Sequence, residues 1–149
     1  GGVSPLEDLQ PVAHAHEILK LIEAVRGVHV AEPVRRYAVD LVGATRTHPE
    51  LRLGASPRAT LHLLRAAKAS AALSGRDYAL PDDVQALAVA VLAHRLLPTA
   101  QAQLNRRTAE QVVHDILQRT TVPAAAPQQT AFGVGGRGAA FGQQPPRRL

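Results

Sequence analysis

Cysteine, methionine and tryptophan are absent from this chain, and its aromatic residues are limited to two tyrosines and two phenylalanines. Without cysteine, the chain cannot form disulfides, thiolate nucleophiles or cysteine-ligated metal sites. With so few aromatic side chains, a core must be built from Leu, Val, Ile and Ala. Because Ala and Leu favour helices, the composition indicates an all-α fold.

Long hydrophobic runs are also missing. No apolar stretch approaches the ~20 residues that a membrane-spanning helix needs, and no signal-peptide pattern opens the chain. We therefore expect no membrane span and a cytoplasmic location. Because methionine is missing even at the first position, we expect the chain to be either trimmed of its initiator or a fragment of a longer protein.

The net charge of +5 is unevenly distributed. Residues 121–149 contain three arginines and no acidic residue, whereas residues 1–120 contain 14 basic and 12 acidic residues and are close to neutral. A broad nucleic-acid-binding face requires clustered positive charge. Lysine and aromatic residues are scarce as well, so we expect no nucleic acid partner.

Apolar residues recur at helical spacing in five segments. Proline stands in the first turn of three of them, at Pro33, Pro57 and Pro81, and Gly75 follows the third of the five segments. Residues 48–55 and 76–80 are expected to be loops, and residues 28–30 are β-prone but too few to imply a sheet. The predicted helices run from about Ala13 to Arg26, from Glu32 to before Pro49, from Ser56 to Ser74, from Pro81 to before Pro98, and from Thr108 to before Pro123.

Composition divides the chain into three parts. Residues 1–12 hold two glycines and two prolines and are expected to be a linker. Residues 13–120 are predicted to form a four- or five-helix bundle. Residues 121–149 are rich in Ala, Gln, Gly, Pro and Arg, and they cannot bury enough apolar surface to offset their conformational entropy. We predict a disordered tail there.

Metal-binding and nucleophile motifs are weak. His14 and His16 are two residues apart and so point to different sides of a helix, and we expect no metal site. The stretch from Gly54 to Arg58 begins like a nucleophile elbow, G-x-S-x-G, but it lacks the final glycine and a predicted strand before the serine. No Walker A sequence is present, so the chain alone cannot cradle nucleotide phosphates in that manner. We expect no catalytic residue in this chain alone.

Arg58 stands at the start of the third predicted helix. Ser56 can cap free backbone N–H groups there, and Pro57 suits the first helical position. An arginine fixed at a helix N-terminus can bind an anion together with free N–H groups. The alternatives are a solvated arginine or one paired with a carboxylate such as Glu50.

Three segments of the chain resemble the C-terminal lid of MoxR-type AAA+ ATPases: VHVAEPVRRYAVDLVGATR, LRLGASPRATLHLLRAAKASAAL and GRDYALPDDVQALAVAVLAHRL. The resemblance covers roughly residues 5–119, and the middle segment is the most specific. In that family the lid is a small helical subdomain that follows an α/β nucleotide-binding core. Its third helix begins with the sensor 2 motif, whose arginine faces the terminal phosphates of ATP. The matching position here is Arg58, with Ser56 and Pro57 as the residues that aim it.

The resemblance implies that the chain contributes to ATP binding and hydrolysis without being an ATPase by itself. The Walker A and Walker B motifs, sensor 1 and the arginine finger belong to the core, so ATP and Mg²⁺ would act in the intact parent. It also implies three partners in a chaperone-like machine: the AAA+ core of the same polypeptide, neighbouring subunits of a hexamer, and a von Willebrand factor A domain protein. The alternative is a stand-alone helical module for protein–protein interaction.

Other positions that match the lid have simpler explanations. Pro81, Asp82 and Asp83 match a common helix start, which capping and complementarity to the helix dipole explain. Arg76 and Asp77 are expected to form a local ion pair. For His94 and Arg95 we expect a structural role, such as tying the fourth helix to a loop.

Overall fold

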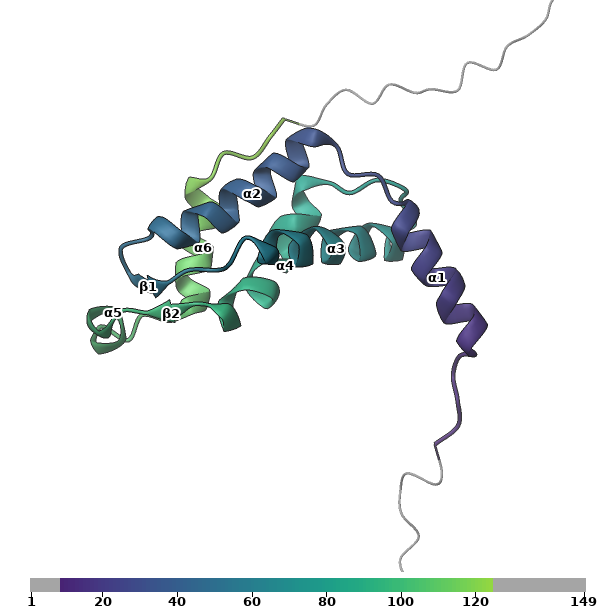
Figure 1. Ribbon diagram of the computed structural model, residues 1–149, viewed down its shortest axis with the longest axis horizontal. Helices are drawn as coiled ribbons and strands as arrows, with labels where there is room; N and C mark the ends of the chain where they lie inside the picture. The colour runs from purple at the N-terminus through teal and green to yellow at the C-terminus, as the bar shows by residue number, and fades with distance from the viewer. Residues whose placement is uncertain (1–8, 125–149) are drawn as a thin grey trace, which may run out of the picture.

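The computed structural model describes residues 9–124, which form six α-helices, a short 3₁₀-helix (η1) and a two-stranded sheet (Figure 1). The predicted all-α fold is confirmed, with this small sheet added. Most of the predicted linker over residues 1–12 and of the predicted tail over residues 121–149 lies outside the described residues. In chain order the elements are α1 (Ala15–Gly27), α2 (Glu32–Thr47), β1 (Leu51–Leu53), α3 (Arg58–Leu73), α4 (Pro81–Leu92), η1 (Ala93–Arg95), β2 (Leu97–Pro98), α5 (Ala100–Leu104) and α6 (Ala109–Arg119).

The core lies between α2, α3, α4 and α6 and is aliphatic apart from Tyr37, as the composition predicts. Its largest fully buried side chains are Leu41, Leu63, Leu92, Val84, Val112, Val113 and Thr45. Buried alanines, including Ala67 on α3 and Ala88 on α4, allow these two helices to pack closely. Figure 1 shows α1 at one end of the molecule, angled away from the bundle, and β1, β2 and α5 at the other end. Among the helices of residues 9–124, none combines the length and apolar character that a bilayer span requires.

Local signals set most helix ends as predicted. Pro33 and Pro81 stand in the first turns of α2 and α4. At the start of α6, the backbone amide of Gln111 donates to Thr108 Oγ1 at 3.3 Å. In return, the backbone amide of Thr108 donates to the side-chain oxygen Oε1 of Gln111 at 3.1 Å. Gly75 has a φ of +71°, a left-handed conformation that suits glycine, and it ends the α3 region.

The sheet was not predicted. Residues 51–53, expected to be part of a loop, form β1 and pair antiparallel with β2. The fourth helix ends at Leu92 and not just before Pro98. A 3₁₀ turn follows it, after which extended backbone buries Leu96 and brings Leu97 opposite Leu53.

The short helix α5 was not predicted either. Thr99 caps it, because its Oγ1 accepts a hydrogen bond from the Ala102 amide at 3.2 Å. Arg107, in the connection between α5 and α6, donates through Nε to Glu50 Oε2 at 3.1 Å and is also paired with Asp115. Arg107 therefore ties the loop before β1 to α6.

The connection from α3 to α4 is organised around Asp83. Arg76 donates through Nη1 and Nη2 to the two carboxylate oxygens at 2.8 and 2.7 Å. Ser70 Oγ and the Leu80 amide donate to the same carboxylate at 3.1 and 2.8 Å. The predicted pair of Arg76 with Asp77 is therefore wrong, and Asp83 does more than complement a helix dipole. Its buried carboxylate joins α3, α4 and the connection between them.

The loop before α3 is fastened to α2 by Thr45, which is 1% exposed. Thr45 Oγ1 donates to the Val42 carbonyl at 2.6 Å and accepts from the Ala55 amide at 2.9 Å. Gly54 packs so tightly here that a Cβ atom on it would lie 2.5 Å from the Thr45 carbonyl oxygen. These contacts fix the path of residues 54–57 into α3.

The Asp83 network predicts a loss of stability in acid. Hydrogen bonding to Arg76, the largest cause, holds the pKa of Asp83 below its usual value of 3.8. The unfolded chain therefore binds the proton more readily, and this stabilisation is present above that pH and lost as the pH falls through the lowered pKa. We expect Asp83→Asn to lower the free energy of unfolding at neutral pH by about 2–4 kcal/mol and to make that free energy decline less in acid. Urea unfolding followed by circular dichroism measures both effects. Asp82→Asn, at the exposed neighbouring carboxylate, is the control, and an equal effect of the two variants would contradict the prediction.

The Thr45 anchor predicts a local effect on the loop. Thr45→Val removes the acceptor of the buried Ala55 amide, so we expect the free energy of unfolding to fall by about 1–3 kcal/mol. Hydrogen exchange at the Ala55 amide should become faster in this variant. Thr45→Ser keeps the hydroxyl and should retain the protection of that amide. Equal exchange rates in the two variants would show that the hydroxyl does not hold the loop.

Candidate functional site

Arg58, singled out by its place in the sequence, is the first residue of α3. Its side chain is exposed, and its guanidinium makes no hydrogen bond or ion pair with any of residues 9–124. The alternative partner, Glu50, is bonded to Arg107 instead. A cation is mildly unfavourable at the positive end of a helix, and here no carboxylate of the described chain offsets that cost. The guanidinium is therefore available to an anion from outside the chain.

The helix start that carries Arg58 is closed by backbone groups. The prediction that the Ser56 side chain caps this helix is wrong: the Ser56 carbonyl accepts from the Ala59 amide at 2.8 Å, and its hydroxyl has no hydrogen bond. Pro57 occupies the cap position with φ −54° and ψ −28°, already in the helical region. Because the proline ring sets this φ, the chain turns into the helix one residue before Arg58 without a side-chain cap.

Two further arginines lie beside this helix start. Arg46, in the last turn of α2, and Arg95, at the end of η1, line a hollow of about 430 Å³. We call it the arginine hollow. Its remaining lining residues are Leu53, Gly54, Ala55, Ser56 and Pro57, so it contains two cations and no carboxylate. Sequence spacing does not reveal this arrangement, because the two arginines belong to separate elements.

We predicted that His94 and Arg95 tie α4 to a loop, and the structure shows a different arrangement. Arg95 Nε donates to the Val91 carbonyl at 2.9 Å, and His94 Nδ1 lies 3.2 Å from the Ala90 carbonyl oxygen. Both contacts return to the last turn of α4 itself. They hold the stem of Arg95 while its outer guanidinium nitrogens remain unbonded within the described residues.

The other motifs do not form catalytic or metal sites in the described residues. A short strand, β1, does precede Ser56, contrary to expectation, but the Ser56 hydroxyl contacts no base that could activate it. The rings of His14 and His16 stack with centroids 5.8 Å apart on the exposed helix α1. Residues 9–124 contain no group of three or more His, Asp or Glu side chains placed to hold a metal ion.

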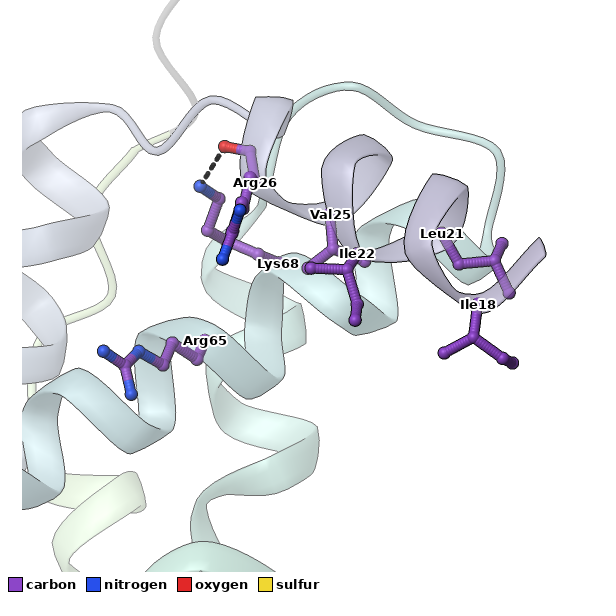
Figure 2. A pocket seen from close by; sticks show the side chains of 7 residues that line it. All are labelled: Ile18, Leu21, Ile22, Val25, Arg26, Arg65 and Lys68. Atoms are coloured by element: carbon purple, nitrogen blue, oxygen red, sulfur yellow. Dashed lines mark hydrogen bonds between the residues drawn. The ribbon is translucent and has the colours of Figure 1, made fainter. Parts of the chain in front are cut away.

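A second surface lies between α1 and α3, at the end of the molecule where α1 projects (Figure 1). Figure 2 shows this groove, which has a volume of about 670 Å³. We call it the α1 groove. Apolar side chains of α1 form one wall, cations lie along the groove, and the lining residues are Ile18, Leu21, Ile22, Val25, Arg26, Arg65 and Lys68. Lys68 Nζ donates to the Arg26 carbonyl at 2.7 Å and joins α3 to the end of α1.

Helix α1 buries none of its residues. Ile18, Leu21 and Ile22 are 46%, 60% and 42% exposed, and Leu19 is 63% exposed. An amphipathic helix normally buries its apolar stripe against another element. A contiguous exposed stripe of this kind marks an interaction surface.

Residues 43–116 match the AAA lid domain family. The chain is 34% identical to the chaperone MoxR1 of Mycobacterium tuberculosis over 139 residues, and 38% identical to YeaC of Bacillus subtilis over 119 residues. These matches cover 86% and 80% of this chain and 37% of each relative.

A solved structure is similar as well. A Cytophaga hutchinsonii protein classed as a candidate ATPase matches 73% of this chain with a TM-score of 0.70 and 29% sequence identity. The match covers 36% of that protein, so this chain spans little more than a third of the length of each of the three relatives. The family match, the relatives and the fold together show that the chain carries the lid domain of a MoxR-family AAA+ ATPase.

Proposed function

We propose that this lid follows an α/β core in its parent polypeptide and supplies Arg58 to the ATP site as the sensor 2 arginine. The observation that carries this proposal is the exposed, unbonded guanidinium at the first position of α3. Its backbone is held in place by the Thr45 anchor. A planar guanidinium can pair with two phosphate oxygens and neutralise charge that develops during phosphoryl transfer.

In this proposal the chain alone does not hydrolyse ATP. It contains no Walker A sequence, and its described residues present no acidic cluster for Mg²⁺. The core would therefore hold ATP and Mg²⁺, and the lid would complete the site from one side. Hexameric assembly, a chaperone-like activity and a von Willebrand factor A partner belong to the same proposal.

The test is Arg58→Ala in the full-length parent. We expect ATP turnover to fall by roughly a hundredfold, the scale for losing one preorganised charge contact. The free energy of unfolding of the isolated lid should change by less than ~1 kcal/mol, because the side chain is exposed. Arg119→Ala, an exposed arginine in the last turn of α6, is the matched control. Normal turnover in Arg58→Ala, or an unfolded lid, would overturn the assignment.

A second candidate function, docking against another part of the parent polypeptide, is favoured by the α1 groove. We propose that its occupant is an amphipathic segment of the α/β core that belongs to the same parent. Nearly two thirds of each relative lies outside the match, so the parent contains ample surface to fill the groove. The groove combines an apolar wall with Arg26, Arg65 and Lys68, and it therefore fits a segment whose apolar face is edged by carboxylates.

The groove predicts that α1 becomes protected in the parent. We expect amide hydrogen exchange of residues 18–25 to be at least about tenfold slower in the parent than in the isolated lid. Ile22→Asp should remove that difference without destabilising the isolated lid, because Ile22 is 42% exposed. Leu104→Asp, at an exposed leucine outside the groove, is the control. Equal exchange in parent and lid, or a dimer of the isolated lid that Ile22→Asp dissociates, would rule out the core as occupant.

A further inference from the structure

We propose that the arginine hollow is a phosphate-binding site in which Arg46 and Arg95 act beside Arg58. This inference rests on the proposed function and deepens it, since it adds two phosphate-binding residues to the one that the family resemblance implies. It concerns the phosphate groups of a polyphosphate, whether carried by a nucleotide or free.

The first argument is uncompensated charge. Both Arg46 and Arg95 line the hollow, and no Asp or Glu does. No ion pair within residues 9–124 involves either arginine. Two cations that share one hollow repel each other, and an anion between them converts that repulsion into attraction.

The second argument is the geometry of the donors. The stem of Arg95 is held by its Nε hydrogen bond to the Val91 carbonyl, which leaves the two outer nitrogens to bind a ligand. The guanidinium of Arg46 makes no hydrogen bond within the described chain. The two side chains reach the hollow from α2 and η1, so they can contact different oxygens of one ligand. Guanidinium groups suit this role because their N–H donors match pairs of phosphate oxygens.

The third argument is a neutral donor on the same wall. The hydroxyl and the amide of Ser56 have no hydrogen-bond partner among the described residues, and Ser56 lines the hollow. The loop that presents them is anchored at Ala55 through Thr45, so the backbone that carries these donors is held before any ligand arrives. Preorganised donors cost less to bring together on binding.

Charge selects a polyphosphate over a carboxylate. Arg46, Arg95 and the neighbouring Arg58 place three positive charges around one end of α3. A single carboxylate would neutralise one of them, whereas a triphosphate carries enough negative charge to meet all three. The hollow is open to solvent, so we expect binding by the isolated chain to be weak and salt-dependent.

The test is an amide NMR titration of the 149-residue chain, at constant ionic strength, with inorganic triphosphate, ATP and orthophosphate in separate arms. We expect shifts at residues 46, 54–58 and 95, and tighter binding of triphosphate than of orthophosphate. Arg46→Ala and Arg95→Ala should each weaken triphosphate binding by roughly three- to tenfold, the range for one exposed charge-assisted hydrogen bond. Arg46→Lys and Arg95→Lys, which keep the charge, should weaken it less. Arg119→Ala removes the same charge elsewhere and should change the affinity by less than about twofold.

Each outcome decides between specific alternatives. Binding of ATP at least as tight as that of triphosphate identifies the nucleotide as the source of the phosphates, and binding of triphosphate alone identifies a free polyphosphate. No shifts at the hollow, or equal weakening by Arg46→Ala and Arg119→Ala, would overturn the proposal. If Arg58 is essential for turnover in the parent while Arg46 and Arg95 bind nothing, only this inference fails. If the hollow binds triphosphate while Arg58→Ala turns over normally, only the sensor 2 assignment fails.

Discussion

The position of Arg58 depends on one buried hydroxyl. A threonine inside a helix commonly donates a hydrogen bond to a carbonyl of its own helix, and Thr45 does so. Its hydroxyl oxygen also accepts a hydrogen bond from the backbone amide of Ala55, which belongs to a different segment. The path of the loop is thereby tied to the last turns of α2. Gly54 adds a steric condition, since no side chain fits between the loop and α2 at that point. The third helix therefore begins at one place, and the guanidinium of Arg58 extends from a backbone that packing has already fixed.

Five of the six α-helices in residues 9–124 could be predicted, because their signals are local. Apolar periodicity marks each segment, and Pro33, Pro81 and the capping pair at Thr108 mark their starts within a few residues. The sheet could not be predicted in this way. Its two strands are short, lie far apart in sequence and are stabilised by pairing with each other. The segment around Leu97 follows a helix and precedes a proline, so the local sequence pattern predicts that the helix continues through it. Only the burial of Leu96 and the pairing with β1 favour extended backbone there.

In the candidate site, too, residues marked by local sequence signals could be predicted, and residues brought together by packing could not. Arg58 was identified from a helix-start pattern and from a family resemblance, both of which are readable in consecutive residues. The role expected for Ser56 failed because the proline that follows it competes with side-chain capping and turns the chain by itself. Arg46 and Arg95 meet only because α2 and η1 pack together, which no spacing in the sequence reports. The ion pair of Asp83 with Arg76 could not be predicted for a similar reason, since Arg76 lies across the turn between α3 and α4.

Helix α3 connects the two surfaces that this lid presents. Arg58 begins the helix, and Lys68, which contacts the end of α1, lies ten residues later, about 15 Å along the axis. The intervening turns are packed through fully buried residues, including Leu63 and Ala67, so we expect the helix to move as a rigid body. A shift of the α1 groove against a core would therefore displace the arginines at the other end by a comparable amount. Conversely, phosphates held at Arg58 would restrain how the groove sits on its partner. This reciprocity would follow from the linkage between two sites on one rigid element, and under the proposed function it would let the lid report the state of the nucleotide.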